Sequence, residues 1–276
     1  GIPASGGTFT GTVTFQNDVT LTGAANNIVF DKSDNALEFA DNAKATFGGS
    51  SDFSIYHNGT NSIINNDTGD LYIQTDNNFK VEAKDGGNDM IHAVPTGQVE
   101  LHYNGAKTFE TIEKGAIIRG KAGGDGELQL YADAGSANAD LWRLKAESGA
   151  AEFEIGNYAN GSSWEKNIRC NANNSVELYY DNSKVFETNN QGVTIQSIEG
   201  EHGVIYLNAD EGDDNADQWA VVASKDASNF IIQNYASGSW ETTIKAIGDG
   251  AVELYENGTK RAETTNTGFN VVGALT

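Results

Sequence analysis

The segment VELHYNGAKTFET at residues 99–111 decides the fold, because closely similar segments return twice further along the chain. The later copies are VELYYDNSKVFET at 176–188 and VELYENGTKRAET at 252–264. Their first valines are spaced by 77 and then by 76 residues. The residues of a catalytic site normally occur once in a sequence. Similar segments at a regular spacing are instead typical of a structural unit that is repeated along the chain.

Each copy has the pattern of a β-hairpin. Apolar and polar residues alternate from 99 to 103, which predicts a strand with one apolar and one polar face. Asn104-Gly105 then favours the positive φ angles of a type I′ turn, and a second strand returns from Ala106. We therefore predict hairpin tips at 104–105, 181–182 and 257–258.

The repeat extends beyond the hairpin. A glycine and a short apolar run predict a third strand at 115–118, 192–195 and 268–271. The segments ADAGSANADLW (132–142) and FEIGNYANGSSWE (153–165) return as ADEGDDNADQW (209–219) and FIIQNYASGSWE (230–241), the last one serine shorter. We divide the chain into an N-terminal β connector (1–48), a divergent β repeat (49–120) and two further β repeats (121–197 and 198–276).

A glutamate and a lysine recur on the polar face of each hairpin. The pairs are Glu100 with Lys107, Glu177 with Lys184, and Glu253 with Lys260. Opposite charges on neighbouring strands attract weakly, and exposed pairs contribute less than about 1 kcal/mol each. We expect a solvated charged face, with glutamates that stay ionised and have no chemical role.

Composition excludes several classes of partner. The formal net charge of -22, from 39 acidic and 17 basic residues, opposes binding to nucleic acid or anionic lipid. Cys170 is the only cysteine, so no disulfide can form within one chain. No apolar run approaches the roughly 18 residues that a membrane span needs, so we expect no membrane insertion. No segment has a helical period with caps, which predicts an all-β chain.

The repeats are also short of core. Only 38% of the residues are hydrophobic, and 32 are glycine. Such a unit cannot easily offset its own conformational entropy, so other copies of the chain are expected to supply the missing burial. Three copies would bury one face of every sheet and leave the other, acidic face exposed to solvent. The predicted fold is an elongated array of short-stranded β-hairpin or β-sandwich-like repeats in an intertwined homotrimeric β-prism fibre.

Several phrases resemble the tail-fibre and virion appendage proteins of marine bacteriophages, particularly those that infect cyanobacteria. They are PASGGTFTGTVTF (3–15), FSIYHNGTNSIINN (53–66), GDLYIQTDNNFKVEA (69–83) and VELYYDNSKVFETNNQGVTI (176–195). The resemblance implies a homotrimeric β-structured fibre in the virion, outside the cell, that binds other tail proteins and whose distal end contacts a host glycan or receptor. Such fibres often end in a chaperone domain that cleaves itself off after trimerisation. VVGALT (271–276) is compatible with the end left by that cleavage or with a cut made elsewhere in the polypeptide. We expect that the sequence starting at Gly1 has been cut out of a longer polypeptide.

An acidic turn is the candidate metal site. ADEGDDNAD at 209–217 offers the carboxylate oxygens that calcium prefers, although it lacks the spacing of an EF-hand loop. The corresponding segment in the preceding repeat keeps only two of these acids. A shared calcium site would rest on Asp210 and Asp217, and the alternative is a solvated turn without metal.

Recurring aromatic residues are the candidate glycan contacts. They are Trp142, Tyr158 and Trp164, with their copies Trp219, Tyr235 and Trp240. Flat apolar rings beside polar groups suit sugars, but their presence in both copies favours packing positions of the unit. The four histidines, His57, His92, His102 and His202, lack metal-ligand spacing, and we expect His57 and His102 to face solvent beside their Asn-Gly turns.

These observations favour a structural function. We expect a shaft or adhesin segment of a phage tail fibre that supports or makes host-surface attachment and is not an enzyme. A tailspike depolymerase that cleaves host surface polysaccharide is the alternative, although no nucleophile elbow, phosphate-binding loop or zincin motif occurs. A cellular surface adhesin repeat is a second alternative.

Overall fold

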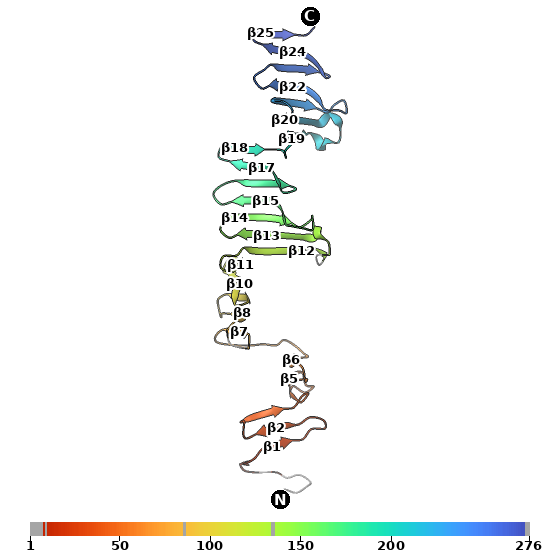
Figure 1. Ribbon diagram of the computed structural model, residues 1–276. Coiled ribbons are helices and arrows are strands. Elements are labelled where there is room, and N and C mark those ends of the chain that lie inside the picture. Colours follow the sequence, from red (N-terminus) through yellow and green to blue (C-terminus); the bar gives the residue numbers. More distant parts are fainter. Residues whose placement is uncertain (1–7, 9, 85–86, 134–135, 274–276) are drawn as a thin grey trace. The chain divides into compact units, whose positions relative to one another are not determined.

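A computed structural model describes residues 8, 10–84, 87–133 and 136–273 (Figure 1). Within these ranges the chain forms antiparallel β-strands and short 3-10 turns, which confirms the prediction of an all-β protein. In the same ranges, none of the helical turns has the length and hydrophobicity that a membrane span requires. Gly1, the beginning of the 3–15 phrase and the last three residues of VVGALT lie outside the described residues.

The chain divides into two compact units, Gly1–Asp76 and Asn77–Thr276. The first unit holds two three-stranded sheets. One sheet consists of β1 (Val19–Leu21), β2 (Ile28–Asp31) and β3 (Ala36–Phe39). The other consists of β4 (Lys44–Phe47), β5 (Phe53–His57) and β6 (Ser62–Asn66). The boundary placed at 48/49 from the sequence lies between β4 and β5, which pair with each other.

The second unit holds three larger sheets, and in each of them every strand pairs with its neighbour in sequence (Figure 1). The smallest contains β7 (Phe79–Glu82), β8 (Asp89–Ala93), β9 (Val99–Tyr103), β10 (Ala106–Ile112) and β11 (Gly115–Ile118). The next contains β12 (Gly126–Tyr131), β13 (Leu141–Glu147), β14 (Glu152–Asn157), β15 (Glu165–Asn171), β16 (Val176–Tyr180), β17 (Ser183–Asn189) and β18 (Gly192–Ile195). The last contains β19 (Gly203–Asn208), β20 (Gln218–Ala223), β21 (Asn229–Asn234), β22 (Glu241–Ile247), β23 (Val252–Glu256), β24 (Thr259–Thr265) and β25 (Gly268–Val271).

The predicted hairpins and the strands that follow them are confirmed. Tips at 104–105, 181–182 and 257–258 join β9 to β10, β16 to β17 and β23 to β24. Asn104 and Gly105 have φ angles of 52° and 77°, as a type I′ turn requires, and the other two tips also have positive φ angles. The glycine-led runs after the hairpins form β11, β18 and β25.

The two seven-stranded sheets have corresponding strand positions. Strands β19 to β21 begin 77 residues after β12 to β14, and β22 to β25 begin 76 residues after β15 to β18. The difference arises in the loop before β15 and β22, where the later copy lacks one serine. The boundary placed at 120/121 lies between β11 and β12, and the boundary placed at 197/198 lies between β18 and β19. The sandwich-like packing and the trimeric prism stay predictions.

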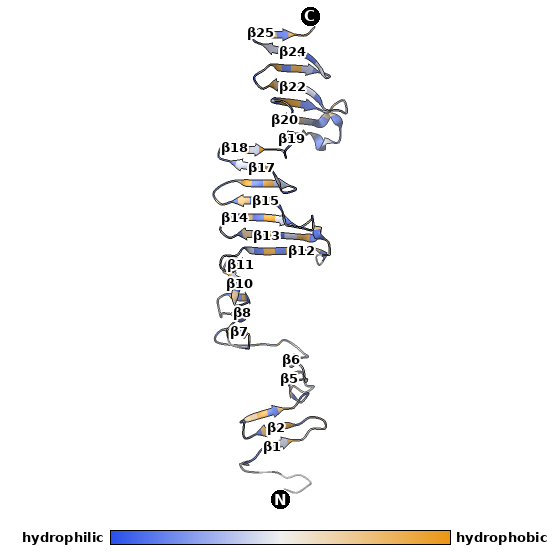
Figure 2. Ribbon diagram, in the orientation of Figure 1, coloured by the Kyte–Doolittle hydropathy of each residue, from blue (hydrophilic) through white to orange (hydrophobic). Residues whose placement is uncertain are grey.

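The described residues contain almost no hydrophobic core. The buried hydrophobic residues are Ala43, Ala220, Val222 and Ala262, and none of them is large. Hydrophobic and hydrophilic residues nevertheless alternate along strands such as β12 and β14 (Figure 2). Each sheet therefore sorts its side chains onto two faces, and most of its large hydrophobic side chains stay at least partly exposed.

Candidate functional site

One face of each large sheet carries a row of apolar residues that runs across all its strands. In the second unit the rows are Val81, Ile91, Leu101, Phe109 and Ile118; Leu128, Leu144, Ile155, Ile168, Leu178, Phe186 and Ile195; and Ile205, Val221, Ile232, Ile244, Leu254, Ala262 and Val271. We call the face that carries this row the apolar face of each sheet. Every neighbour within a row is a directly opposed cross-strand partner, so the rows form continuous apolar stripes.

The apolar face is uncovered in a single chain. The equivalent residues Leu101, Leu178 and Leu254 expose 43%, 39% and 40% of their surface. Monomeric soluble proteins rarely leave contiguous apolar areas of this kind open, and large ones mark interaction surfaces. Further burial would stabilise an assembly by about 25 cal/mol for each Å² removed from water.

The opposite face of the sheets is charged, and here the sequence-based prediction of a solvated face is wrong. Glu100, Glu177 and Glu253 are buried, with only 8%, 4% and 8% of their surface exposed. Each lies on a strand with partners on both sides, so long side chains from both neighbouring strands cover its carboxylate. We call this side of each sheet the charged face. The alternation along the strands separates the two faces correctly, but in a single chain the charged face is more buried than the apolar face.

Hydrogen bonds keep these glutamates ionised. Burial acts to raise the pKa of Glu177, but donors from Arg169 Nε at 2.7 Å and the Tyr179 hydroxyl at 2.5 Å outweigh it and lower that pKa to about 2. The Lys107 ammonium, 2.9 Å away, is the main group that lowers the pKa of Glu100 to about 2. The pKa of Glu253 is also lowered, chiefly by the Tyr255 hydroxyl at 2.7 Å. The predicted ionisation is therefore confirmed.

A second charged network lies on the same face of β12–β15. Arg143 Nη2 donates to Glu154 Oε1 at 2.6 Å, and Glu154 is only 1% exposed. Arg143 Nη1 lies 3.6 Å from Glu127, and its guanidinium carbon lies 4.7 Å from the centroid of the Trp164 ring. Arg143 thus pairs with two carboxylates and covers an indole face at the same time.

The candidate glycan contacts fall into two groups. In the loops, Tyr158 packs against Trp164 with ring centroids 5.5 Å apart, and Tyr235 packs against Trp240 at 5.2 Å. Trp142 and its copy Trp219 instead lie on the apolar faces of β13 and β20. The structure therefore pairs the loop aromatics with each other and separates them from the strand tryptophans.

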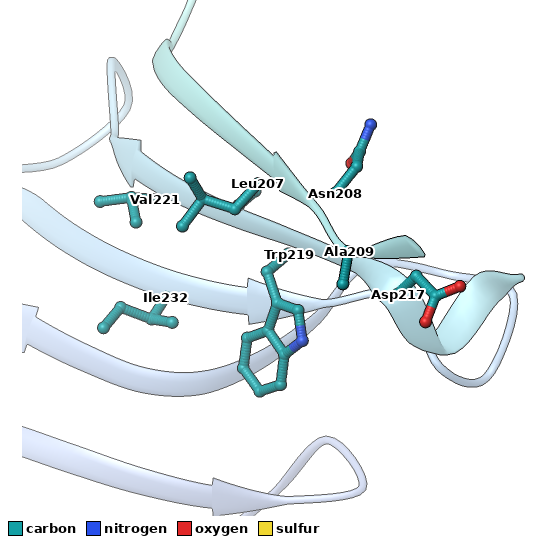
Figure 3. A pocket seen from close by; sticks show the side chains of 8 residues that line it. Leu207, Asn208, Ala209, Asp217, Trp219, Val221 and Ile232 are labelled. Atoms are coloured by element: carbon teal, nitrogen blue, oxygen red, sulfur yellow. The ribbon is translucent and has the colours of Figure 1, made fainter. Parts of the chain in front are cut away.

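Trp219 borders an open apolar hollow of about 370 Å³ (Figure 3). Leu207, Val221 and Ile232 line the same hollow on the apolar face. Asp217 lies at its rim, where the 3-10 turn before β20 ends. The hollow belongs to the apolar face, so an assembly that covers this face would cover Trp219 as well.

The acidic turn brings three carboxylates together, and the calcium site stays a prediction. Asp217 lies in a group with Asp213 and Asp214, whose carboxylate oxygens are within 4.8 Å of one another, and Asp210 is not a member. A similar group of Asp31, Asp34 and Glu38 was not predicted from the sequence. Asp31 accepts hydrogen bonds from the Ser33 hydroxyl at 2.6 Å and its backbone N–H at 2.7 Å, which lower its pKa.

The histidines divide between the surface and the charged face. His57 is exposed as predicted, with Nδ1 2.9 Å from Asp41. The same prediction for His102 is wrong, because its side chain is only 13% exposed and its Nε2 lies 3.3 Å from Glu100. His92 Nδ1 lies 3.2 Å from the same carboxylate oxygen. His102 is partly buried because the polar side of β9 belongs to the covered charged face.

Compared with known proteins, the chain matches no family model and no curated sequence.

Proposed function

We propose that this chain is a structural segment of a phage tail fibre, which forms a shaft or adhesin support for attachment to the host surface. The observation that carries the proposal is the uncovered apolar face, which repeats from sheet to sheet in the second unit. A chain without a large buried hydrophobic side chain among its described residues needs partners to bury its leucines and isoleucines. The resemblance of its repeated phrases to virion appendage proteins favours other copies of the chain as those partners.

A homotrimer suits this surface. Three copies that turn their apolar faces toward a common axis bury the continuous rows, while the charged faces point outward. The outward faces then carry the paired charges, and the net charge of -22 on each chain helps to keep a long assembly soluble. In this arrangement the segment is extracellular, binds other tail proteins along the fibre and contacts a host glycan or receptor at its exposed positions.

The charged face supports a role without catalysis. A glycosidase needs one carboxyl group with a raised pKa to donate a proton to the leaving group. The buried glutamates Glu100, Glu177 and Glu253 all have lowered pKa values and paired oxygens. Their arrangement favours a structural network, and therefore a fibre segment over a polysaccharide depolymerase.

The proposal is tested on the virions whose genome carries this sequence. Antibodies against the chain, visualised by immunogold electron microscopy, should label fibres on the particle. Label on the host cell envelope in the absence of particles would contradict the proposal and favour a cellular adhesin. Incubation of the purified protein with host surface polysaccharide should produce no new reducing ends, whereas release of oligosaccharides would favour the depolymerase.

A further inference from the structure

The charged faces of the two seven-stranded sheets differ at one place. The strands β12–β14 and β19–β21 pair in the same register, so each charged position on this face has a counterpart 77 residues later, including Lys145, which pairs with Glu147 at 3.0 Å. Glu127, Arg143, Lys145 and Glu154 correspond to Val204, Ala220, Val222 and Ile231. Removal of a single partner would leave a buried charge unpaired at a cost of about 3–5 kcal/mol. In the last sheet all four charges are absent together.

A hollow of about 210 Å³ takes the place of the network in the last sheet. Its lining consists of Val204, Ala220, Val222 and Ile231 with His202, Tyr206, Gln233 and Trp240. The change from Arg143 to Ala220 removes the side chain that would cover the indole. Trp240 packs against Tyr206 and Tyr235, with ring centroids 5.6 Å and 5.2 Å apart, and keeps 37% of its surface exposed.

Hydrogen-bonding groups surround this apolar hollow. The Tyr206 hydroxyl, the Gln233 amide and the Trp240 indole N–H have no hydrogen-bond partner within the described residues. His202 Nδ1 accepts a hydrogen bond from the backbone N–H of Lys225 at 3.0 Å. In the neutral imidazole this leaves Nε2 as a donor, and Nε2 lies 3.9 Å from Asp226 Oδ2. The hollow thus combines an aliphatic floor with several free donors and acceptors.

We propose that this hollow binds a single neutral pyranose ring of a glycan. The C–H face of a pyranose matches the apolar floor and the aromatic rings, and its hydroxyls match the surrounding polar groups. The volume is below the roughly 300–1,000 Å³ of sites for drug-sized molecules, which suits one ring. No carboxylate lines the hollow, so a cationic ligand would be desolvated there without a counter-ion.

The inference deepens the proposed function and rests on it for one point. If the apolar faces meet at a common axis, the hollow lies on the outer side of the assembly, where a host glycan can reach it. Three copies of a weak site then act together, so that avidity compensates for a poor monovalent affinity. The hollow itself is formed by β19–β21 of one chain together with His202 and Trp240 from the adjoining loops.

Saturation-transfer NMR of the purified full chain tests the site. The probes are the methyl α-D-pyranosides of glucose, mannose, galactose and N-acetylglucosamine, with tetramethylammonium as a cationic probe. At least one pyranoside should bind, and Tyr206→Gln and Gln233→Ala should each weaken that binding about tenfold. Gln129 occupies the position of Tyr206 in the preceding sheet, so Tyr206→Gln is compatible with the fold. Tyr131→Gln, which changes a similarly exposed tyrosine on β12, should leave binding unchanged.

Three results would overturn the site: no binding of any pyranoside, equal binding by Tyr206→Gln, or binding of tetramethylammonium in their place. Sedimentation of the same samples separates this inference from the proposed function. A trimer that binds no pyranoside would contradict the sugar site alone. A monomer that binds a pyranoside through Tyr206 would contradict the trimeric fibre and leave the site standing.

Discussion

Glutamate side chains form part of the buried structure of these sheets. Glu177 shows how this is possible, because Arg169, Tyr179 and Lys184 all direct donors at its carboxylate. A buried carboxylate is tolerated when its oxygens are paired, and the removal of one partner from such a network is costly. The repeated Glu-Lys pattern could be read from the sequence, but its burial depends on cross-strand neighbours that are distant in sequence.

Replacement of Glu177 by glutamine should make stability less dependent on pH. The pKa of Glu177 is about 2 in the folded chain, below its ordinary value of 4.5. Its ionised form therefore stabilises the fold fully above about pH 4.5, and this contribution is lost as the pH falls toward 2. Glu177→Gln should lower the free energy of unfolding by about 1–3 kcal/mol at pH 7. The difference from the unmodified chain should shrink at pH 3, as measured by urea denaturation.

Glu256→Gln is the matched control for this prediction. Glu256 also pairs with an arginine, at 3.0 Å from Arg261, but its side chain is 66% exposed. Its replacement should change the free energy of unfolding by no more than about 0.5 kcal/mol. Equal losses in the two variants would show that burial of Glu177 does not contribute to stability.

At the scale of elements, local signals predicted the hairpins and long-range contacts decided the rest. Asn104-Gly105 and the alternation around it determine the turn type within a few residues, so the sequence suffices there. The same alternation defines two faces without showing which is covered, which is why His102 was misplaced. The hollow beside Trp240 was not predicted. The replacement of Arg143 by Ala220 at equivalent positions of the repeat is visible in the sequence and could have indicated it.

The turn glycines provide a test of the hairpin geometry. Gly105 and Gly258 have φ angles of 77° and 68°, where an L-residue costs roughly 1–2 kcal/mol. Alanine at either position should lower the free energy of unfolding by about that amount. Gly105→Ala should cost more, because its Cβ would lie 2.4 Å from Asn88 Oδ1, whereas nothing lies within 4 Å at Gly258. Denaturation of both variants measures this, and an unchanged stability would contradict the assigned turns.

At the scale of the whole molecule, the account depends on what covers the apolar face. Leu128 and Gln129 are neighbours on β12 whose side chains point to opposite faces, and both are exposed in a single chain. Leu128→Glu should disrupt assembly, because a charge would be buried against apolar rows of other copies. Gln129→Glu adds the same charge on the charged face opposite Arg143 and should leave assembly intact. Size-exclusion chromatography distinguishes the two, and an equal effect would contradict the orientation of the faces.

Sedimentation equilibrium of the purified chain at micromolar and nanomolar concentrations is the most direct measurement of this claim. The account predicts a particle with three times the 29.4 kDa mass of one chain. Cooperative unfolding is then expected only for the assembled particle and not for a single chain. A cooperatively folded species of 29.4 kDa at both concentrations would contradict it, because the apolar face would then be stable in water without a partner.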